Sequence, residues 1–235
     1  PPPPTPTSRC SSAASDVYKR QEFLFRAIEA RSGFLGVWAL AILLSLILWA
    51  VPLDLFQRAF GPVPPPLAIL LAGVAGFFLV GRVSHGRRPV PWGRLLAIAA
   101  VFLLPPVAID LAIPFADDLN APFPLALAFY PAAGFLAEVV FHLLPLAVMA
   151  IVLRQTELPV WAFVPAVLAE PVFQAAASGG FTAQGMLVAI HVTLFSGVQL
   201  WVFRRHGFVA MYVFRLFYYA FWHLLWGTLR LTLFF

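Results

Sequence analysis

The chain has 235 residues, of which 62% are hydrophobic and 11% are charged. An average soluble domain has roughly 45–50% apolar and about 25% charged residues, so an ordinary soluble domain is excluded. The net charge of +5 does not indicate nucleic-acid binding, because the basic residues lie mostly in short loops between apolar runs, where they set membrane topology. The composition predicts an all-α, polytopic bundle of membrane helices whose main partner is the lipid bilayer.

The amino-terminal stretch differs from the rest of the chain. Residues 1–21 are rich in Pro, Ser and Thr and show no apolar period, so we expect them to be disordered. Their run SSAASDVYKRQ resembles a translated cloning junction, which indicates a leader of non-native origin. Residues 22–33 alternate apolar and charged residues at helical spacing, and we expect an amphipathic helix on the membrane surface.

Residues 34–235 are predicted to form a single bundle of about seven transmembrane helices. A spanning helix needs about 20 mostly apolar residues. The expected spans are 34–55, 64–83, 95–114, 125–153, 160–177, 185–203 and 208–229. The fourth is long for one straight span, which indicates a tilt or a break near Pro131.

Arginines in the loops predict how the bundle is oriented. They occupy the loops after the second, fourth and sixth spans, as Arg82, Arg87, Arg88, Arg94, Arg154, Arg204 and Arg205. With seven spans these loops share one side of the membrane, which the positive-inside rule makes cytoplasmic. We therefore expect an integral protein of a prokaryotic cytoplasmic membrane, with its N-terminus inside and its C-terminus outside.

Ionisable residues within the spans are concentrated in the second half of the chain. Each one near the bilayer centre costs roughly 2.5–3.5 kcal/mol on insertion scales, so each needs a reason. The first three spans carry almost none apart from Asp110. The last four carry the polar residues Glu138, His142, Glu170, Gln174, His191, Gln199, Arg215 and His223.

Three of these spans carry a polar stripe at i, i+4 spacing, which places its members on one helix face. The stripes are Glu138 with His142, Glu170 with Gln174, and Arg215 with Tyr219 and His223. Turning the stripes toward one another and away from lipid is the least costly arrangement. The topology places Glu138, Glu170, His191 and His223 at broadly similar depths, which makes a shared site geometrically possible.

Several kinds of chemistry fit these residues. Glu138 with His223, and with His142 beside it, can activate water as a general base with a positioning histidine. The candidates for substrate binding are Arg215, Gln174, Tyr219 and His191, although packing also explains His191. The same residue types can form a proton relay or a structural ion pair. Histidine and carboxylate are also zinc ligands, but the chain has no HExxH motif, and we expect no metal or other cofactor.

Three runs of the chain carry motifs in a particular order: AEVVFH, FVPAVLAEPVFQ and FWHLLWG. This order resembles the CAAX-protease and bacteriocin-processing (CPBP, or Abi) family of glutamate-dependent intramembrane proteases. The family's first motif is a Glu pair followed four residues later by Arg, usually with an aromatic residue before the Arg. Glu138 corresponds to the second Glu, Phe141 to the aromatic residue and His142 to the Arg, while Ala137 replaces the first Glu.

The two later motifs correspond in part, and the resemblance covers about Ala126 to Gly227. The second motif is Phe, three residues and then His, and the last is His followed four residues later by Asn or Asp. Phe163 matches the second motif, Val167 stands at its His position, and Glu170 and Gln174 are the nearest polar substitutes. His223 matches the last motif, and Gly227 stands at its Asn position.

The resemblance implies a divergent CPBP-like intramembrane hydrolase, a glutamic-type endopeptidase that acts on a membrane-embedded or lipid-linked peptide. By correspondence, Glu138 would be the general base, His223 the oxyanion or water-positioning group, and Glu170 a substitute polar partner. Two alternatives stay open. A small-solute or proton-linked transporter would need a polar path to both membrane faces, and a non-catalytic scaffold would use the carboxylates and Arg215 only as ion pairs.

Overall fold

The computed structural model describes residues 9–50, 56–57, 61–83, 86, 88–177 and 182–234, with side chains for residue 21 and from residue 27 onward. Residues 1–8 of the expected disordered leader, residues 51–55 of the first expected span and Arg87 lie outside the described residues. The regular elements described are all helical. They are α1 (Arg9–Ala50), α3 (Pro65–Val80), α4 (Trp92–Ala112), η1 (Asp117–Leu119), α5 (Ala126–Ala137), η2 (Glu138–Leu143), α6 (Leu144–Leu153), η3 (Val160–Phe163), α7 (Val164–Ala177), α8 (Ala183–His206), α9 (Phe208–Tyr219), η4 (Ala220–Trp226) and α10 (Gly227–Phe234).

Five of the described helical stretches are long and apolar enough to cross a membrane. They are Ala27–Ala50, Trp92–Ala112, Ala126–Leu153, Ala183–His206 and Phe208–Phe234. Large apolar side chains such as Leu71, Leu104 and Leu194 are exposed on the outer faces of the helices, as expected where lipid is the solvent. The chain is therefore an all-α protein with the helices of a polytopic membrane protein.

The second and fifth expected spans are shorter than the others. They correspond to the apolar helices Pro65–Val80 and Val160–Ala176. The first of these has 16 residues, and at about 1.5 Å per residue it rises roughly 24 Å, less than the hydrocarbon core of about 30 Å. Prolines stand at the starts of both helices, where Pro is favoured, and the first of them ends at Val80, three residues before the expected end of the span.

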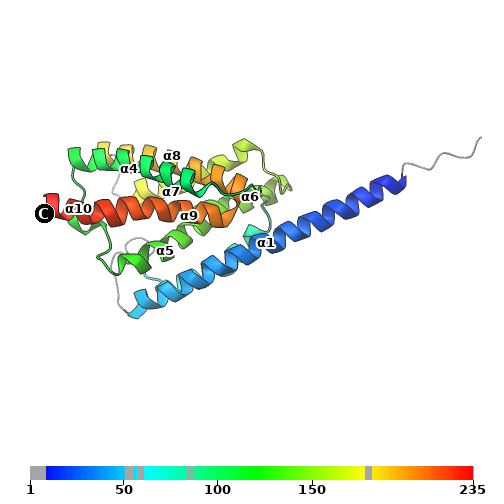
Figure 1. Ribbon diagram of the computed structural model, residues 1–235, viewed down its shortest axis with the longest axis horizontal. Helices are drawn as coiled ribbons and strands as arrows, with labels where there is room; N and C mark the ends of the chain where they lie inside the picture. Colours follow the sequence, from blue (N-terminus) through cyan, green and yellow to red (C-terminus); the bar gives the residue numbers. More distant parts are fainter. Residues whose placement is uncertain are drawn as a thin grey trace, which may run out of the picture.

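The helix α1 starts earlier than the sequence analysis predicts. It begins at Arg9, so residues 9–21 are helical where we expected disorder. Residues 22–33 are continuous with the first span instead of forming a separate surface helix. No Gly or Pro interrupts the chain between Arg9 and Ser32, so a helix can propagate through this stretch. In Figure 1 the amino-terminal part of α1 projects well beyond the bundle.

The helix α9 is central in the bundle because it contacts α1, α4, α5 and α8. Its side chains Met211, Tyr212 and Phe214 are buried, and its continuation through η4 and α10 runs along the middle of the molecule in Figure 1. Two long helices widen into π-helical turns, at η2 and at η4. Polar groups on α9 and η2 are therefore placed inside the bundle.

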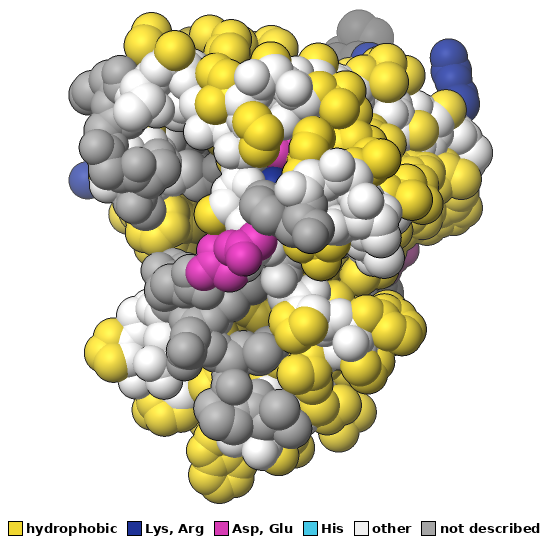
Figure 2. All heavy atoms as spheres, turned by 90° about the vertical axis from the view of Figure 1, so that its left-hand side faces the viewer, with side chains coloured by type: hydrophobic (Ala, Val, Ile, Leu, Met, Phe, Trp, Pro, Cys, Tyr) yellow, Lys and Arg dark blue, Asp and Glu magenta, His cyan; other side chains and the backbone are white. Residues whose placement is uncertain are grey.

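The arginine-rich loops meet at one end of the bundle. Gly86 N donates to Arg204 O at 2.7 Å, Arg88 N donates to Arg205 O at 3.1 Å, and His206 Nδ1 lies 2.9 Å from Arg88 O. Arg82 and Arg154 line one common hollow. Figure 2 looks onto the other end, where α10 lies, and acidic side chains gather near the middle of that face. The two ends of the bundle therefore differ in charge.

Candidate functional site

Arg215 on α9 is the centre of a buried polar network. Its Nε donates to Glu138 Oε1 at 2.7 Å, and its Nη1 and Nη2 donate to the two carboxylate oxygens of Glu170 at 2.9 and 2.7 Å. The Arg215 side chain is 1% exposed. One guanidinium therefore joins three elements, η2, α7 and α9, whose polar stripes the sequence predicts to face one another.

Every N–H of the Arg215 guanidinium has an acceptor. Besides the three bonds to carboxylates, Nη1 donates to Tyr219 Oη at 2.9 Å and Nη2 donates to Gln199 Oε1 at 3.1 Å. A guanidinium has five N–H donors, so none is left over. Because breaking a buried ion pair leaves an uncompensated charge that costs about 3–5 kcal/mol, this network fixes the packing of α9.

Glu138 is enclosed by its partners. Its Oε1 accepts from both Arg215 and Gln199, its Oε2 lies 2.6 Å from His142 Nδ1, and its side chain is 0% exposed. Glu138 and His142 stand in the π-helical turn η2, and Pro145 follows three residues later. Proline removes an N–H and crowds the carbonyl four residues back, which accounts for a widened turn at this place. Such turns are often found at functional sites.

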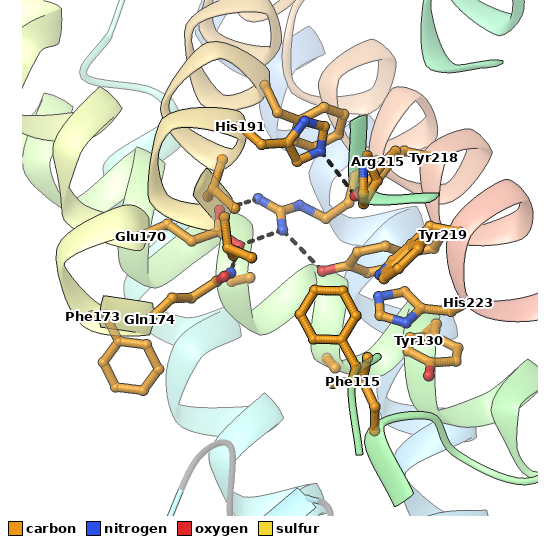
Figure 3. Close-up of a pocket in the computed structure, with 18 of the residues that line it drawn as sticks. Phe115, Tyr130, Glu170, Phe173, Gln174, His191, Arg215, Tyr218, Tyr219 and His223 are labelled. Atoms are coloured by element: carbon orange, nitrogen blue, oxygen red, sulfur yellow. Dashed lines mark hydrogen bonds and ion pairs between the residues drawn. The ribbon is translucent and has the colours of Figure 1, made fainter. Parts of the chain in front are cut away.

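A cavity of about 520 Å³ lies beside the network and takes in its outer edge. Most of its lining is apolar or aromatic, including Phe115, Phe129, Phe141, Phe173, Phe195 and Trp222. Its polar lining residues include Glu170, Gln174, His191, Arg215, Tyr219 and His223. Figure 3 shows Glu170 on one side, Tyr219 and His223 on the other, and the guanidinium of Arg215 between them. This size and lining are typical of small-molecule and cofactor sites.

The predicted site residues divide into two groups around this cavity. Glu170, Arg215, Tyr219, Gln174, His191 and His223 line it, whereas Glu138 and His142 are not among its lining residues. Glu138 reaches the cavity only through Arg215. The hydrogen bonds described for Glu138 are with Arg215, Gln199 and His142, whereas the one described for His223 is with Asn120. The direct partnership of Glu138 with His223 stays a prediction.

His223 belongs to a second cluster at the mouth of the cavity. Its Nδ1 lies 2.7 Å from Asn120 Oδ1, and its ring stacks on that of Tyr130 with centroids 4.1 Å apart. Tyr130 Oη donates to the same Asn120 oxygen at 3.2 Å. An Nδ1–H tautomer of His223 fits this acceptor oxygen, and in that neutral ring Nε2 carries a lone pair.

Sequence reasoning missed Asn120, which lies in the connection before α5. A Cβ atom added at Gly227 would lie 2.8 Å from Asn120 Nδ2, so the amide of Asn120 occupies the space beside Gly227. This is the position at which the last CPBP motif carries Asn or Asp. No local pattern links residues more than a hundred positions apart, and a loop asparagine is ordinarily interpreted as a turn residue.

Two further polar pairs complete the described site region. His191 Nε2 lies 3.0 Å from Tyr218 Oη on the cavity wall. Near the end of α4, Asp110 binds Arg230 of α10 through Oδ2 to Nε at 2.8 Å and Oδ1 to Nη2 at 3.1 Å, and Trp226 Nε1 donates to the same carboxylate. Asp110 and Arg230, both outside the expected site, therefore compensate each other.

The residues whose side chains are described do not form a metal site. Within this part of the chain, no group of three or more His, Cys, Asp or Glu side chains lies close enough to hold a metal ion. Comparison with protein-family models, with curated proteins and with solved structures finds no match. The likeness to CPBP proteases therefore rests on the motifs alone.

Proposed function

We propose that this chain is a seven-span integral membrane protein whose arginine-rich end is cytoplasmic and whose cavity opens toward the opposite side. The five long apolar helices support membrane insertion, and the two shorter ones complete the count. The orientation is supported by the loops of Arg88, Arg204 and Arg205, which meet at one end. Positively charged loops are retained on the cytoplasmic side, which puts the N-terminus inside and the C-terminus outside.

We further propose that the protein is a CPBP-like intramembrane hydrolase acting on a membrane-embedded or lipid-linked peptide. The observation that carries this proposal is that Glu170, from one side, and Tyr219 and His223, from the other, line an otherwise largely apolar cavity. An apolar substrate segment fits such a lining, and a carboxylate, a phenol and an imidazole are ordinary acid–base groups. Glu138, enclosed by Arg215 and His142, is then a positioning residue that holds Arg215.

The proposed reaction uses the cavity residues in three roles. Glu170 takes a proton from a water molecule whose oxygen bonds to the peptide carbonyl carbon. Tyr219 Oη accepts a hydrogen bond from Arg215, so its own O–H is free to donate to the developing oxyanion. The C–N bond then breaks, and the proton held by Glu170 passes to the leaving nitrogen, with His223 available to relay it through Nε2.

The proposal is tested with the purified chain in proteoliposomes that contain a pool of synthetic single-span peptides, in water enriched in ¹⁸O. Wild-type protein is expected to release fragments that carry ¹⁸O at a new carboxyl terminus, detected by mass spectrometry. Glu170→Gln should reduce cleavage by about 10²–10⁴-fold and Tyr219→Phe by about 10²–10³-fold. Wild-type protein that cleaves no peptide in the pool, or cleavage that survives Glu170→Gln, would contradict it.

A non-catalytic membrane scaffold is the second candidate, and the saturation of Arg215 favours it. All five guanidinium donors and both Glu138 oxygens are paired, as expected for a network that only specifies helix packing. Under this alternative Tyr219→Phe changes stability by about 1 kcal/mol and no activity. A transporter is less well supported, because the described lining of the cavity includes no residue of the arginine-rich loops at the opposite end of the bundle.

A further inference from the structure

Phe141 and Phe173 stand where the cavity meets the outer surface of the bundle. Both side chains line the cavity, and their rings pack against each other with centroids 5.1 Å apart. Phe173 is nevertheless 41% exposed, and Phe141 is half-buried. A side chain that lines a cavity and is also exposed stands at the boundary between the two, so this pair of rings forms part of the outer wall.

The surface around the two rings is apolar. Val140, next to Phe141, and Val172, next to Phe173, are both exposed. Phe141 also falls near the middle of the long apolar stretch Ala126–Leu153. Apolar side chains that are exposed at this depth of a membrane helix face hydrocarbon, so the wall formed by the rings borders the bilayer rather than water.

The helices that carry the rings touch near Phe141 and Phe173 and have other neighbours further along. α7 packs against η2 and α6, whereas α5, which precedes η2, packs mainly against α1 and α9. The side chains of α5 that line the cavity next to Phe141 are the small Ala137 and Ala133, one and two turns away. The rings therefore occupy the contact between two walls, and space for a ligand lies behind them.

The mouth of the cavity near His223 is narrowed by the connection after α4. Phe115 of this connection lines the cavity, and Gln184 Nε2 donates to Ile113 O at 2.8 Å, which fastens the connection to the start of α8. Figure 3 shows Phe115 on the side of His223 and Phe173 on the other side of the cavity. The rings therefore offer an approach to the cavity that is separate from its mouth.

We propose that Phe141 and Phe173 form a lateral gate through which an apolar chain enters the cavity from the bilayer. Next to Phe173 inside the cavity, Gln174 Nε2 donates to Glu170 Oε1 at 3.4 Å, and both residues line the cavity. Glu170 precedes Phe173 by three residues, so the two side chains are neighbours on the surface of α7. A chain that passes between the rings therefore meets the proposed general base.

The lining favours an extended apolar segment of a membrane-embedded peptide as the entering chain. Aromatic side chains such as Phe129, Phe195 and Trp222 line the cavity behind the gate, and they accept apolar groups without leaving polar ones unpaired. A water-soluble peptide would have to cross the apolar surface around the gate. The identity of the chain as a substrate rests on the proposed function, whereas entry through the gate requires no hydrolysis.

The gate can open without the unfolding of a helix. Phe141 stands in the π-helical turn η2, and Pro145 lacks the N–H that would bind the Phe141 carbonyl in a regular α-helix. Phe173 is partly exposed, and exposed side chains change rotamer within picoseconds to nanoseconds. Rotation of the Phe173 ring away from Phe141 is therefore enough to separate the two rings.

The test uses the full chain in proteoliposomes whose phosphatidylcholine carries a photoactivatable diazirine in one acyl chain, which serves as the apolar probe. After irradiation, mass spectrometry measures labelling of Glu170 and Tyr219, which line the cavity. Wild-type protein is expected to be labelled at both residues. Phe173→Trp should reduce this labelling about tenfold, as expected when one added group obstructs a hydrophobic passage, and Phe173→Ala should raise it. Val172→Trp places the same side chain one residue away, outside the cavity lining, and should be labelled as wild type is.

Cleavage of single-span peptides provides the second arm. Phe173→Trp should slow cleavage by the same factor, and Val172→Trp should leave it unchanged. If wild-type protein cleaves no peptide while the labelling changes as expected, the proposed function fails and the gate stands. The gate is overturned if Glu170 and Tyr219 are not labelled in wild type, if labelling is equal in Phe173→Trp, Phe173→Ala and wild type, or if Val172→Trp reduces labelling as much as Phe173→Trp.

Discussion

Two buried arginines on the last long helix have similar burial but different surroundings. Arg215 and Arg230 are 1% and 0% exposed, and each binds a carboxylate through two nitrogens. The ion pair described for Arg230 is with Asp110, and Arg230 also donates to the carbonyls of Ala116 and Phe115. Arg215 faces two carboxylates and lines the cavity.

The difference separates a structural ion pair from a candidate functional one. The described partners of Arg230 join α10 to α4 and to the connection after it. At Arg215 two carboxylates share one guanidinium, and His142 lies beside one of them, Glu138. Two buried carboxylates around one guanidinium, one of them lining the cavity, are a costly arrangement for packing alone, and this is why we propose chemistry for that region.

The largest effect is expected from Arg215→Met. The substitution leaves Glu138 and Glu170 buried together without a counter-charge, so the loss in free energy of unfolding should reach or exceed the upper part of the range of about 3–5 kcal/mol known for broken buried pairs. Titration with sodium dodecyl sulfate in mixed micelles measures it. A loss below about 1 kcal/mol would mean that the carboxylates are not held as the structure shows.

The next largest effect comes from double substitutions, which compare how much stability is recovered when a carboxylate partner of each arginine is also replaced. Arg230→Met alone should cost about 3–5 kcal/mol, and adding Asp110→Leu should recover most of that loss, because replacing both partners of a buried pair by apolar residues is often nearly neutral. The same titration gives both values. Glu138→Leu with Arg215→Met should recover little, since Glu170 remains unpaired. Equal recovery in the two double variants would remove the distinction between the regions.

The sequence predicted the meeting of polar helix faces but not which atoms face the cavity. The i, i+4 stripes and the cost of burying charge were sufficient to bring Glu138, Glu170 and Arg215 into contact. They were insufficient to show that Glu138 turns into the network and does not line the cavity, because the spacing places side chains on one helix face but does not place the cavity.

Two other contacts were not predicted because they join residues that are far apart in the sequence. Asn120 meets His223, and Asp110 meets Arg230, across more than a hundred residues. Such pairs depend on how the connection after α4 folds back against η4 and α10, and no periodicity encodes that path. The start of α1 at Arg9 was missed for another reason, since Ser- and Pro-rich composition outweighed the helix propensity of the stretch after it.

The smallest effect on stability is expected from Gly227→Ala. This substitution tests the cluster of Asn120 and His223 separately from the network around Arg215. The added Cβ would lie 2.8 Å from Asn120 Nδ2 and 3.0 Å from its Cγ, so the amide must move away from His223. Crowding of this kind costs about 1–3 kcal/mol, whereas Ala for Gly within a helix recovers up to about 1 kcal/mol. The net loss in the detergent titration should therefore be about 1 kcal/mol.

Gly197→Ala is a suitable control, because no heavy atom lies within 4 Å of a Cβ at that position and a small gain is expected. In the peptide-cleavage assay Gly227→Ala should lower the rate by disturbing His223 while Gly197→Ala leaves it unchanged. Equal rates in the two variants would remove His223 from the proposed relay and leave the chemistry to Glu170 and Tyr219.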